Sequence, residues 1–264
     1  MARLRDRIIL WDLDGTLYRS RAAYRFFAHC VAEGLPSEAR DAYLARTESY
    51  LGGVLPEGLT EFGSDWGAMV RLALPFLDED EESLGRISQD GFARLRPYLL
   101  GGAPDIRPNA VLRRFLKAAR RFARLAVVTN GPSLEARPLL SRLGIADLFD
   151  AVIAEAGKPE GLIQAQKTVS ELDPGVSFRE TLSVGDNWRN DLLPALQAGW
   201  KTAFVLPLAG GLPPDVRATW QARELEPLLP EIAHWLVKGP DRPVTRWQPV
   251  GGLTEEAGIG PAEG

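Results

Sequence analysis

Two aspartates separated by one residue, Asp12 and Asp14, directly follow an apolar run near the start of the chain. That run, residues 8–11, has the character of a buried parallel strand, and ligands of parallel sheets bind beyond the carboxyl ends of the strands. Side chains two residues apart on an extended chain point to the same side, so both carboxylates would face one site. Their mutual repulsion then requires a cation or a proton between them. The alternative is a strand that ends in an ordinary Asp-Gly turn.

Two later segments carry groups that suit a phosphate. An apolar run over residues 125–128 ends in Thr129, Asn130 and Gly131, where a hydroxyl and exposed backbone N–H groups can bind phosphate oxygens. Further on, Lys158 stands just before Pro159. Proline favours the first position of a helix, which predicts a helix that begins at Pro159. A lone lysine is just as often a solvated surface residue, so Lys158 by itself leaves both roles open.

A third apolar run, residues 181–184, again ends in an acid. Gly185 and Asp186 follow it, and Asp191 stands five residues beyond Asp186. Asp186 therefore occupies the same kind of position, past the end of an expected strand, as Asp12. Asp191 has an alternative role as an acid near a helix N-terminus, where the helix dipole favours negative charge.

The order of these four segments is more specific than any one of them. Asp-x-Asp-Gly-Thr, Thr-Asn-Gly, Lys-Pro and Gly-Asp-x-x-x-x-Asp follow one another, each beside an expected strand or helix start. The ordered set closely resembles the haloacid dehalogenase (HAD) superfamily over about residues 7 to 206. The resemblance implies a phosphatase-type hydrolase with a Rossmann-like core and a helical cap inserted after the first motif.

The resemblance also implies roles for the first two acids. Asp12 would attack phosphorus and form an aspartyl-phosphate, which splits one hard displacement into two easier ones. Asp14 would protonate the leaving oxygen and then activate the water that hydrolyses the intermediate. Dehalogenases and phosphonatases of this superfamily lack an acid at this position, so the presence of Asp14 favours phosphate esters.

The cofactor and the remaining ligands follow from the same resemblance. A hard divalent cation must hold the phosphate against the acids, and an all-oxygen site suits Mg²⁺. The expected metal ligands are the side chain of Asp12, the backbone carbonyl of Asp14 and the side chain of Asp186, with Asp191 close by or acting through water. The expected phosphate-binding residues are Thr129, Asn130 and Lys158. Asn187 and Trp188 stand where relatives often carry smaller residues, which leaves the geometry around the metal open.

Composition agrees with an enzyme that has one substantial core. The chain has 264 residues, 45% of them hydrophobic, and a net charge of −4, which gives no overall attraction to nucleic acid or to an anionic membrane. The basic cluster between Arg113 and Arg124 alternates with apolar residues at helical spacing, as on the solvated face of an amphipathic helix. Cys30 is the only cysteine, and neither a signal peptide nor a spanning segment is recognisable, so we expect a cytoplasmic protein.

The expected architecture is α/β, with a three-layer Rossmann-like core around a parallel sheet and a smaller α-helical cap domain. Residues 1–19 and 106–238 form the core, residues 20–105 the cap, and residues 239–264 a Gly/Pro-rich C-terminal tail. Amphipathic patterns predict cap helices over about 21–33, 38–51, 65–74 and 83–96. After residue 125, strands at about 150–154, 181–184 and 202–206 alternate with helices at about 133–143, 159–172, 189–198 and 223–238. Pro138 predicts a late start or a kink in the first of these helices.

Together these inferences predict a Mg²⁺-dependent phosphatase that hydrolyses a small phosphorylated metabolite. A phosphomutase on the same scaffold uses the same residues and is the alternative among enzymes. A binding or regulatory protein with weak catalysis is the alternative from another class. The sequence identifies neither the substrate nor the oligomeric state, because the specificity contacts lie in the cap.

Overall fold

The computed structural model describes residues 5–59, 62–78 and 80–238, and the predicted tail at 239–264 lies outside this part of the chain. The described residues contain a six-stranded, parallel sheet in the order β3-β2-β1-β4-β5-β6. The strands are β1 (Arg7–Trp11), β2 (Ala123–Val128), β3 (Ala151–Ile153), β4 (Glu180–Gly185), β5 (Lys201–Val205) and β6 (Trp220–Ala222). The predicted α/β class with a parallel sheet is confirmed.

Nine α-helices accompany the sheet in the described residues. They are α1 (Arg21–Glu33), α2 (Arg40–Leu51), α3 (Asp65–Arg71), α4 (Glu81–Gly101), α5 (Ala110–Ala119), α6 (Ser133–Arg142), α7 (Gly161–Ser170), α8 (Leu193–Gln197) and α9 (Leu229–Val237). Side-chain caps define several of the starts, because a Ser, Asp or Asn oxygen there accepts hydrogen bonds from the first free backbone N–H groups. Ser20, Ser64, Asp80 and Asn109 cap α1, α3, α4 and α5 in this way.

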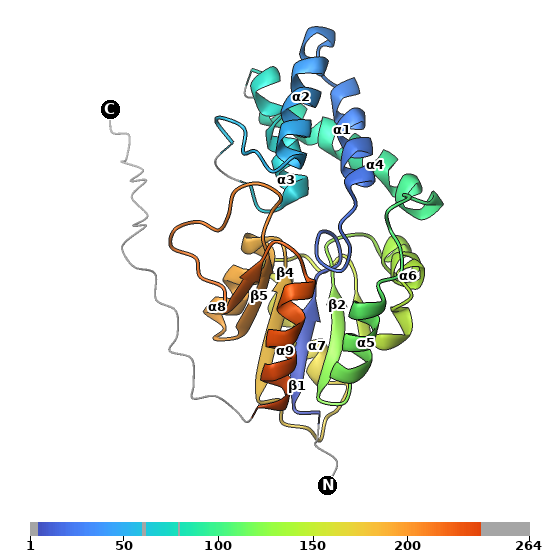
Figure 1. Cartoon of the computed structure of the whole chain (residues 1–264), viewed down its shortest axis with the longest axis vertical. Helices are drawn as coiled ribbons and strands as arrows, with labels where there is room; N and C mark the ends of the chain where they lie inside the picture. The colour runs from blue at the N-terminus through green and yellow to red at the C-terminus, as the bar shows by residue number, and fades with distance from the viewer. Residues whose placement is uncertain (1–4, 60–61, 79, 239–264) are drawn as a thin grey trace, which may run out of the picture.

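The central strand β1 has helices on both of its faces, as alternation along a strand requires. Ile8 and Leu10 pack in one cluster with residues of α7 and α8. Ile9 and Trp11 pack in a second, larger cluster with residues of α5, α6 and α9. Figure 1 shows α5 and α9 in front of the sheet and α7 behind it. The core therefore has three layers, and its middle strand carries the first motif.

The register of the sheet brings three of the motif strands to the same level. Trp11 of β1 is paired with Val127 of β2 on one side and with Val184 of β4 on the other. The chain continues from β1 to β2 and β3 on one side of it, and then returns to β4 and β5 on the other side. Open parallel sheets bind ligands at the point where the strand order reverses in this way. The residues after all three strands must consequently meet at one edge.

Helices α1–α4, here called the helical insertion, lie between β1 and α5 in the sequence and beyond the carboxyl edge of the sheet in space (Figure 1). α1 packs along α4 and α2. Buried residues of the insertion, such as Phe27 and Met69, belong to the same continuous cluster as Trp11 of the core. The insertion therefore covers the edge at which the motif strands end.

Several predicted boundaries differ from the structure. The helix predicted to begin at Pro159 begins at Gly161, after a tight turn in which Gly161 N–H donates to the carbonyl of Gly157. A Cβ on Gly161 would lie 1.6 Å from the carbonyl oxygen of Ala156, so the turn is closed against the preceding chain. Of the two outcomes predicted for Pro138, the late start does not occur: α6 begins at Ser133, as the predicted range of 133–143 has it, and includes Pro138.

The C-terminal half differs from the predicted pattern in two further places. The helix expected at 189–198 starts as a single π turn, Trp188–Leu192, before α8. Pro194 has no N–H to donate into a regular turn, which favours a wider one. The short strand β6 falls in a segment without apolar periodicity, and α9 begins only at Leu229. In the described residues, no helix combines the length and apolar character needed to cross a bilayer.

Candidate active site

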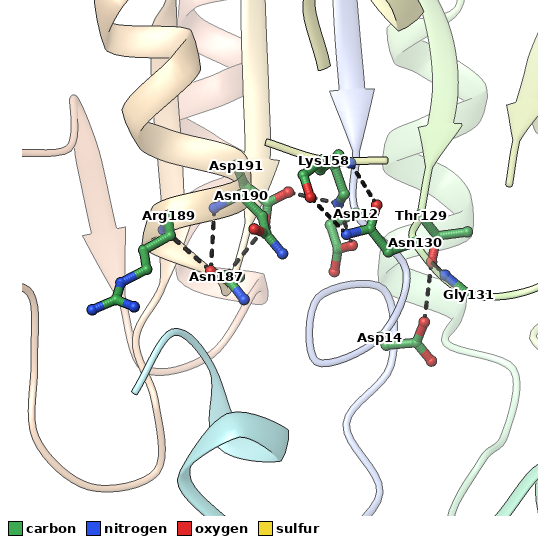
Figure 2. A network of polar contacts seen from close by, with 10 residues as sticks. All are labelled: Asp12, Asp14, Thr129, Asn130, Gly131, Lys158, Asn187, Arg189, Asn190 and Asp191. Carbon is green, nitrogen blue, oxygen red and sulfur yellow. Dashed lines mark hydrogen bonds and ion pairs between the residues drawn. The ribbon is translucent and has the colours of Figure 1, made fainter. Parts of the chain in front are cut away.

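Lys158 lies between two carboxylates at the edge where β1, β2 and β4 end (Figure 2). Its Nζ donates to Oδ1 of Asp12 at 2.7 Å and to Oδ1 of Asp191 at 2.6 Å. The three side chains are only 2%, 9% and 2% exposed, so Lys158 is not a solvated surface lysine. Burial acts to lower the pKa of Lys158, but the charges of Asp12 and Asp191 together raise it. Lys158 is thus a fixed positive charge.

Asn130 holds the backbone of Lys158 in place. Its amide Nδ2 donates to the carbonyl of Lys158 at 2.9 Å, and the N–H of Lys158 donates to its Oδ1 at 2.7 Å. These two bonds tie the loop after β2 to the turn before α7 (Figure 2). The side-chain amide of Asn130 therefore positions Lys158, and its expected contact with phosphate stays a prediction.

Three buried acids converge beside this lysine. Oxygens of Asp12, Asp186 and Asp191 lie within 4.8 Å of one another. Oδ2 of Asp12 and Oδ2 of Asp186 are buried and accept no hydrogen bond. Burial, and then the charge of Asp12, raise the pKa of Asp186 well above its usual range. Burial also raises the pKa of Asp191 to about 6, against the opposing effect of Lys158.

This cluster has the chemistry of a divalent cation site. Lys158 contacts two of the three carboxylates, and one oxygen each of Asp12 and Asp186 has no donor. A hard cation would supply the missing partners and further positive charge. The side chain of Asp14 is not part of the cluster, and only its backbone carbonyl was expected to bind metal. The residues present therefore fit the predicted ion.

Glycines are needed where the acids approach the backbone. Gly15 has φ +91°, and a Cβ there would lie 2.2 Å from Oδ2 of Asp186. A Cβ on Gly185, the last residue of β4, would lie 2.3 Å from Cγ of Asp191. Both positions exclude any larger residue unless the acids move. The glycines of the first and last motifs thus let acids from different segments come together.

Asn187 organises the π turn that carries Asp191. Its Oδ1 accepts from the N–H groups of Arg189 and Asn190 at 3.1 and 3.2 Å, which caps the turn. Its own N–H donates to Oδ2 of Asp191 at 3.1 Å. Figure 2 shows this fan of contacts around Asn187. Sequence reasoning treated Asn187 only as a departure from relatives, although an Asn before a helix start is a recognisable capping signal.

Asp14 has different surroundings from the acids beside Lys158. The hydroxyl of Tyr18 donates to its Oδ1, and Oγ1 of Thr129 donates to its Oδ2 at 3.2 Å. Burial, and then the charge of Asp12, raise the pKa of Asp14 to about 6, while Tyr18, Thr129 and Lys158 oppose the rise. An acid with this pKa can hold and release a proton near neutral pH. Tyr18 was missed in the sequence, where nothing marks it except its closeness to the first motif.

A cavity of about 500 Å³ extends from these acids toward the helical insertion. All the expected site residues lie along it: Asp12, Asp14, Thr129, Asn130, Lys158, Asp186 and Asp191. The insertion contributes Trp66, Phe92 and Arg96 to the far wall, and α6 contributes Glu135. Periodicity in the sequence indicated helices in this region but not which of their residues face the acids.

Comparisons with known proteins agree with this arrangement. The sequence model of the haloacid dehalogenase-like hydrolases matches residues 7–199. The chain is 25% identical to a glyceraldehyde 3-phosphate phosphatase of Methanocaldococcus jannaschii, over 75% of this chain and 84% of that protein. It is 28% identical to an N-acetylmuramic acid 6-phosphate phosphatase of Pseudomonas aeruginosa, over 78% and 84% of the two chains.

A solved structure supports the same fold. The protein described as HAD-hydrolase YfnB of Bacillus subtilis, crystallised with magnesium, superposes with a TM-score of 0.55 at 20% identity. The alignment covers 89% of this chain and all of that one. At this identity the similarity shows the fold alone. Taken with the family match over the four motifs, it confirms the resemblance seen in the sequence, and the chain is an enzyme of the haloacid dehalogenase-like hydrolase family.

Proposed function

We propose that this hydrolase is a Mg²⁺-dependent phosphatase that cleaves a small phosphorylated metabolite through an aspartyl-phosphate. The observation that carries the proposal is the buried contact of Lys158 with Asp12 and Asp191, beside two carboxylate oxygens without partners. A fixed cation and a divalent ion together can neutralise a phosphate that would otherwise be repelled by the acids. The phosphatase activity of the two relatives points in the same direction.

Asp12 is the nucleophile in this mechanism. It follows β1 directly, and its backbone N–H donates to the carbonyl of Val184 at 2.8 Å, which fixes the residue at the sheet edge. Its attack on phosphorus forms the acyl phosphate and releases the alcohol, and water then attacks phosphorus and regenerates Asp12. Lys158 remains protonated throughout and offsets negative charge on the transferring oxygens.

Asp14 is the general acid and then the general base. With a pKa raised to about 6, it retains a proton more readily than an ordinary aspartate and can give it to the leaving oxygen. Once ionised, the same carboxylate can accept a proton from the water that attacks the intermediate. The bonds from Tyr18 and Thr129 hold both of its oxygens, so its orientation is defined before substrate binds.

The cation would be held by the side chains of Asp12 and Asp186 and by the backbone carbonyl of Asp14, with Asp191 close by. When bound, Mg²⁺ supplies positive charge to the phosphate oxygens. The orphaned oxygens of Asp12 and Asp186 and the shortage of positive charge in the cluster support this assignment.

The helical insertion acts as the cap, with domain boundaries close to residues 20 and 105. It contributes a wall of the cavity that begins at Asp12, and it can exclude water from the acyl phosphate. Ser20 and Asp105, one at each boundary, are hydrogen-bonded to each other through Ser20 Oγ, so the two connecting segments lie side by side.

The test is release of inorganic phosphate from acetyl phosphate and 4-nitrophenyl phosphate, with Mg²⁺ and with excess chelator. We expect turnover that chelation abolishes and added Mg²⁺ restores. Phosphate released to water identifies a phosphatase, whereas a phosphomutase would retain it until a second sugar phosphate accepts it. No phosphate release from either substrate with Mg²⁺ would refute the proposal. A single equivalent of nitrophenol per enzyme would then favour a phosphomutase, and no nitrophenol at all would favour a binding protein.

A further inference from the structure

The wall of the cavity opposite the acids is built from aromatic rings. Trp66 of α3 and Phe92 of α4 line it, with ring centroids 6.1 Å apart. Leu95 and Leu99, on the next turns of α4, continue the same apolar surface. A leaving group bound between this wall and Asp12 would therefore meet ring faces and aliphatic side chains.

These rings are held in place by a packed layer behind them. Phe27 of α1 is fully buried and contacts both, with centroids 5.5 Å from Trp66 and 4.5 Å from Phe92. Tyr24 packs edge-on against Trp66 at 4.5 Å. Gly91 allows this packing, because a Cβ there would lie 3.0 Å from the ring of Phe27. The wall is consequently preorganised, and ligand binding loses little free energy in ordering these side chains.

Charge in this part of the cavity is already paired. Apart from the motif residues, the charged groups that line it among the described residues are Arg96 of α4 and Glu135 of α6. Nε of Arg96 lies 3.0 Å from Oε1 of Glu135. The other polar side chains of this wall, including Ser64 and Gln89, are neutral. An anionic substituent would meet the carboxylate of Glu135, which is 13% exposed, and the half-exposed Arg96 offsets that repulsion only in part.

We propose that the enzyme selects phosphate monoesters whose leaving group is uncharged, about the size of one or two rings, and broad and apolar on one face. This rests on the proposed phosphatase function and adds the substrate class to it. The cavity of about 500 Å³ includes the space beside the acids where the phosphoryl group would lie, and the part along the aromatic wall can enclose one or two rings. Leaving groups with a carboxylate or a second phosphate are disfavoured, because they would lie beside the carboxylate of Glu135.

The substrate test uses esters matched in leaving-group chemistry. Phenyl and 2-naphthyl phosphate differ mainly in apolar area, and 4-(carbamoylmethyl)phenyl and 4-(carboxymethyl)phenyl phosphate differ mainly in charge. We expect kcat/KM with Mg²⁺ to be about 10-fold higher for naphthyl than for phenyl phosphate. We expect it to be about 10-fold or more higher for the amide than for the carboxylate. Acetyl phosphate has no ring to contact the wall, so its kcat/KM serves as the reference for the hydrolysis steps alone.

A pair of variants tests the wall directly. Phe92→Ala should lower the ratio of kcat/KM for 2-naphthyl phosphate to that for acetyl phosphate by about 10-fold, and Phe92→Leu should restore part of it. Phe26→Ala is the matched control, since it removes another ring of the insertion, stacked on Tyr98 at 4.2 Å and outside the cavity lining. This control should leave the ratio unchanged. Thermal melting verifies that each variant is folded.

The outcomes separate the two proposals. If neither acetyl phosphate nor any of the esters is cleaved with Mg²⁺, the phosphatase function fails and the substrate class fails with it. If acetyl phosphate is cleaved but the naphthyl and amide esters have no advantage, only the substrate class is refuted. A ratio that is the same in Phe92→Ala and in the wild type refutes it as well.

Discussion

Asp65 and Asp186 are both buried carboxylates, 0% and 3% exposed, and they differ in what surrounds their oxygens. Asp65, at the start of α3, accepts hydrogen bonds from the hydroxyl of Tyr50 at 2.7 Å and from the N–H of Leu208 at 2.8 Å. Nε of Arg19 lies 3.4 Å from its other oxygen. Asp186, past the end of β4, keeps one oxygen without any donor.

The difference indicates a structural role for Asp65 and a ligand-binding role for Asp186. Every partner of Asp65 belongs to the protein, and together they tie the helical insertion to the loop after β5 and to the segment after the first motif. A buried charge is tolerated when it is paired and hydrogen-bonded in this way. The environment of Asp186 instead leaves charge uncompensated, which favours a partner from solution. Four substitutions break or sharpen this contrast.

The largest effect is expected for the nucleophile. Asp12→Asn removes the attacking carboxylate but keeps the size and a hydrogen-bonding oxygen beside Lys158, so turnover should fall by about 10⁴-fold or more while the fold persists. Phosphate release from acetyl phosphate measures the loss, and circular dichroism checks the fold. Turnover near the wild-type level would exclude the covalent mechanism.

The next effect concerns proton transfer by Asp14. Asp14→Asn should lower kcat by about 10² to 10⁴-fold for esters of poor leaving groups such as alkoxides. It should lower the rate less for 4-nitrophenyl phosphate, because nitrophenolate leaves without a proton. Equal losses for both kinds of ester would mean that Asp14 has only a structural role, through its hydrogen bonds with Tyr18 and Thr129.

Asp65 should affect stability rather than chemistry. Asp65→Asn leaves Arg19 without its buried anionic partner, and breaking such a pair costs about 3 kcal/mol of unfolding free energy. Urea or thermal unfolding measures the loss. Hydrolysis of acetyl phosphate below the unfolding temperature should change far less than in Asp12→Asn. A variant as stable as the wild type would show that the Asp65 contacts do not hold the insertion to the core.

The smallest effect has the opposite sign. In chelator, Asp186→Asn should stabilise the fold by about 1 kcal/mol or more at neutral pH. Burial forces the folded protein to keep Asp186 protonated at a pH where the unfolded chain ionises it, and Asn removes that cost. The gain should grow as the pH rises above the ordinary carboxyl pKa of 3.8, since the folded protein there retains a proton on Asp186 that the unfolded chain releases.

Mg²⁺ provides the control for this last variant. Millimolar Mg²⁺ should raise the melting temperature of the wild type, because an ion that binds only the folded state stabilises it. The same concentration should raise that of Asp186→Asn much less. A variant that is less stable than the wild type in chelator would contradict the view that Asp186 lacks a partner without metal.

Local sequence was enough to predict the motif strands and the residues just beyond them. An apolar run precedes each of Asp12, Thr129 and Asp186, and its composition predicts a buried strand of a parallel sheet. Strands of one parallel sheet have their carboxyl ends at one edge, so the residues after them are expected to lie together. It was also enough for the helix at 21–33, whose amphipathic pattern predicted the bounds that the structure has. These signals extend over a few residues, so no knowledge of the fold is needed to read them.

Other features depend on residues that are far apart in the sequence. Whether Lys158 is buried was undecided, since its partners lie 146 and 33 residues away. The start of α7 at Gly161 and the pairing of β6 with β5 likewise follow from contacts that periodicity does not encode. The domain boundaries and the roles of the site residues stay predictions until the variants above are measured.

The sequence by itself determined the identity and order of the candidate reactive groups, because those groups lie within a few residues of the ends of the strands. Only the tertiary structure decided which acids lie close enough together to hold a cation and which are satisfied by the protein. That distinction depends on tertiary contacts, because the groups that satisfy Asp65 come from distant parts of the chain: the hydroxyl of Tyr50, the guanidinium of Arg19 and the N–H of Leu208. The aromatic wall of Trp66 and Phe92 was decided in the same way, by how four helices pack over one sheet edge.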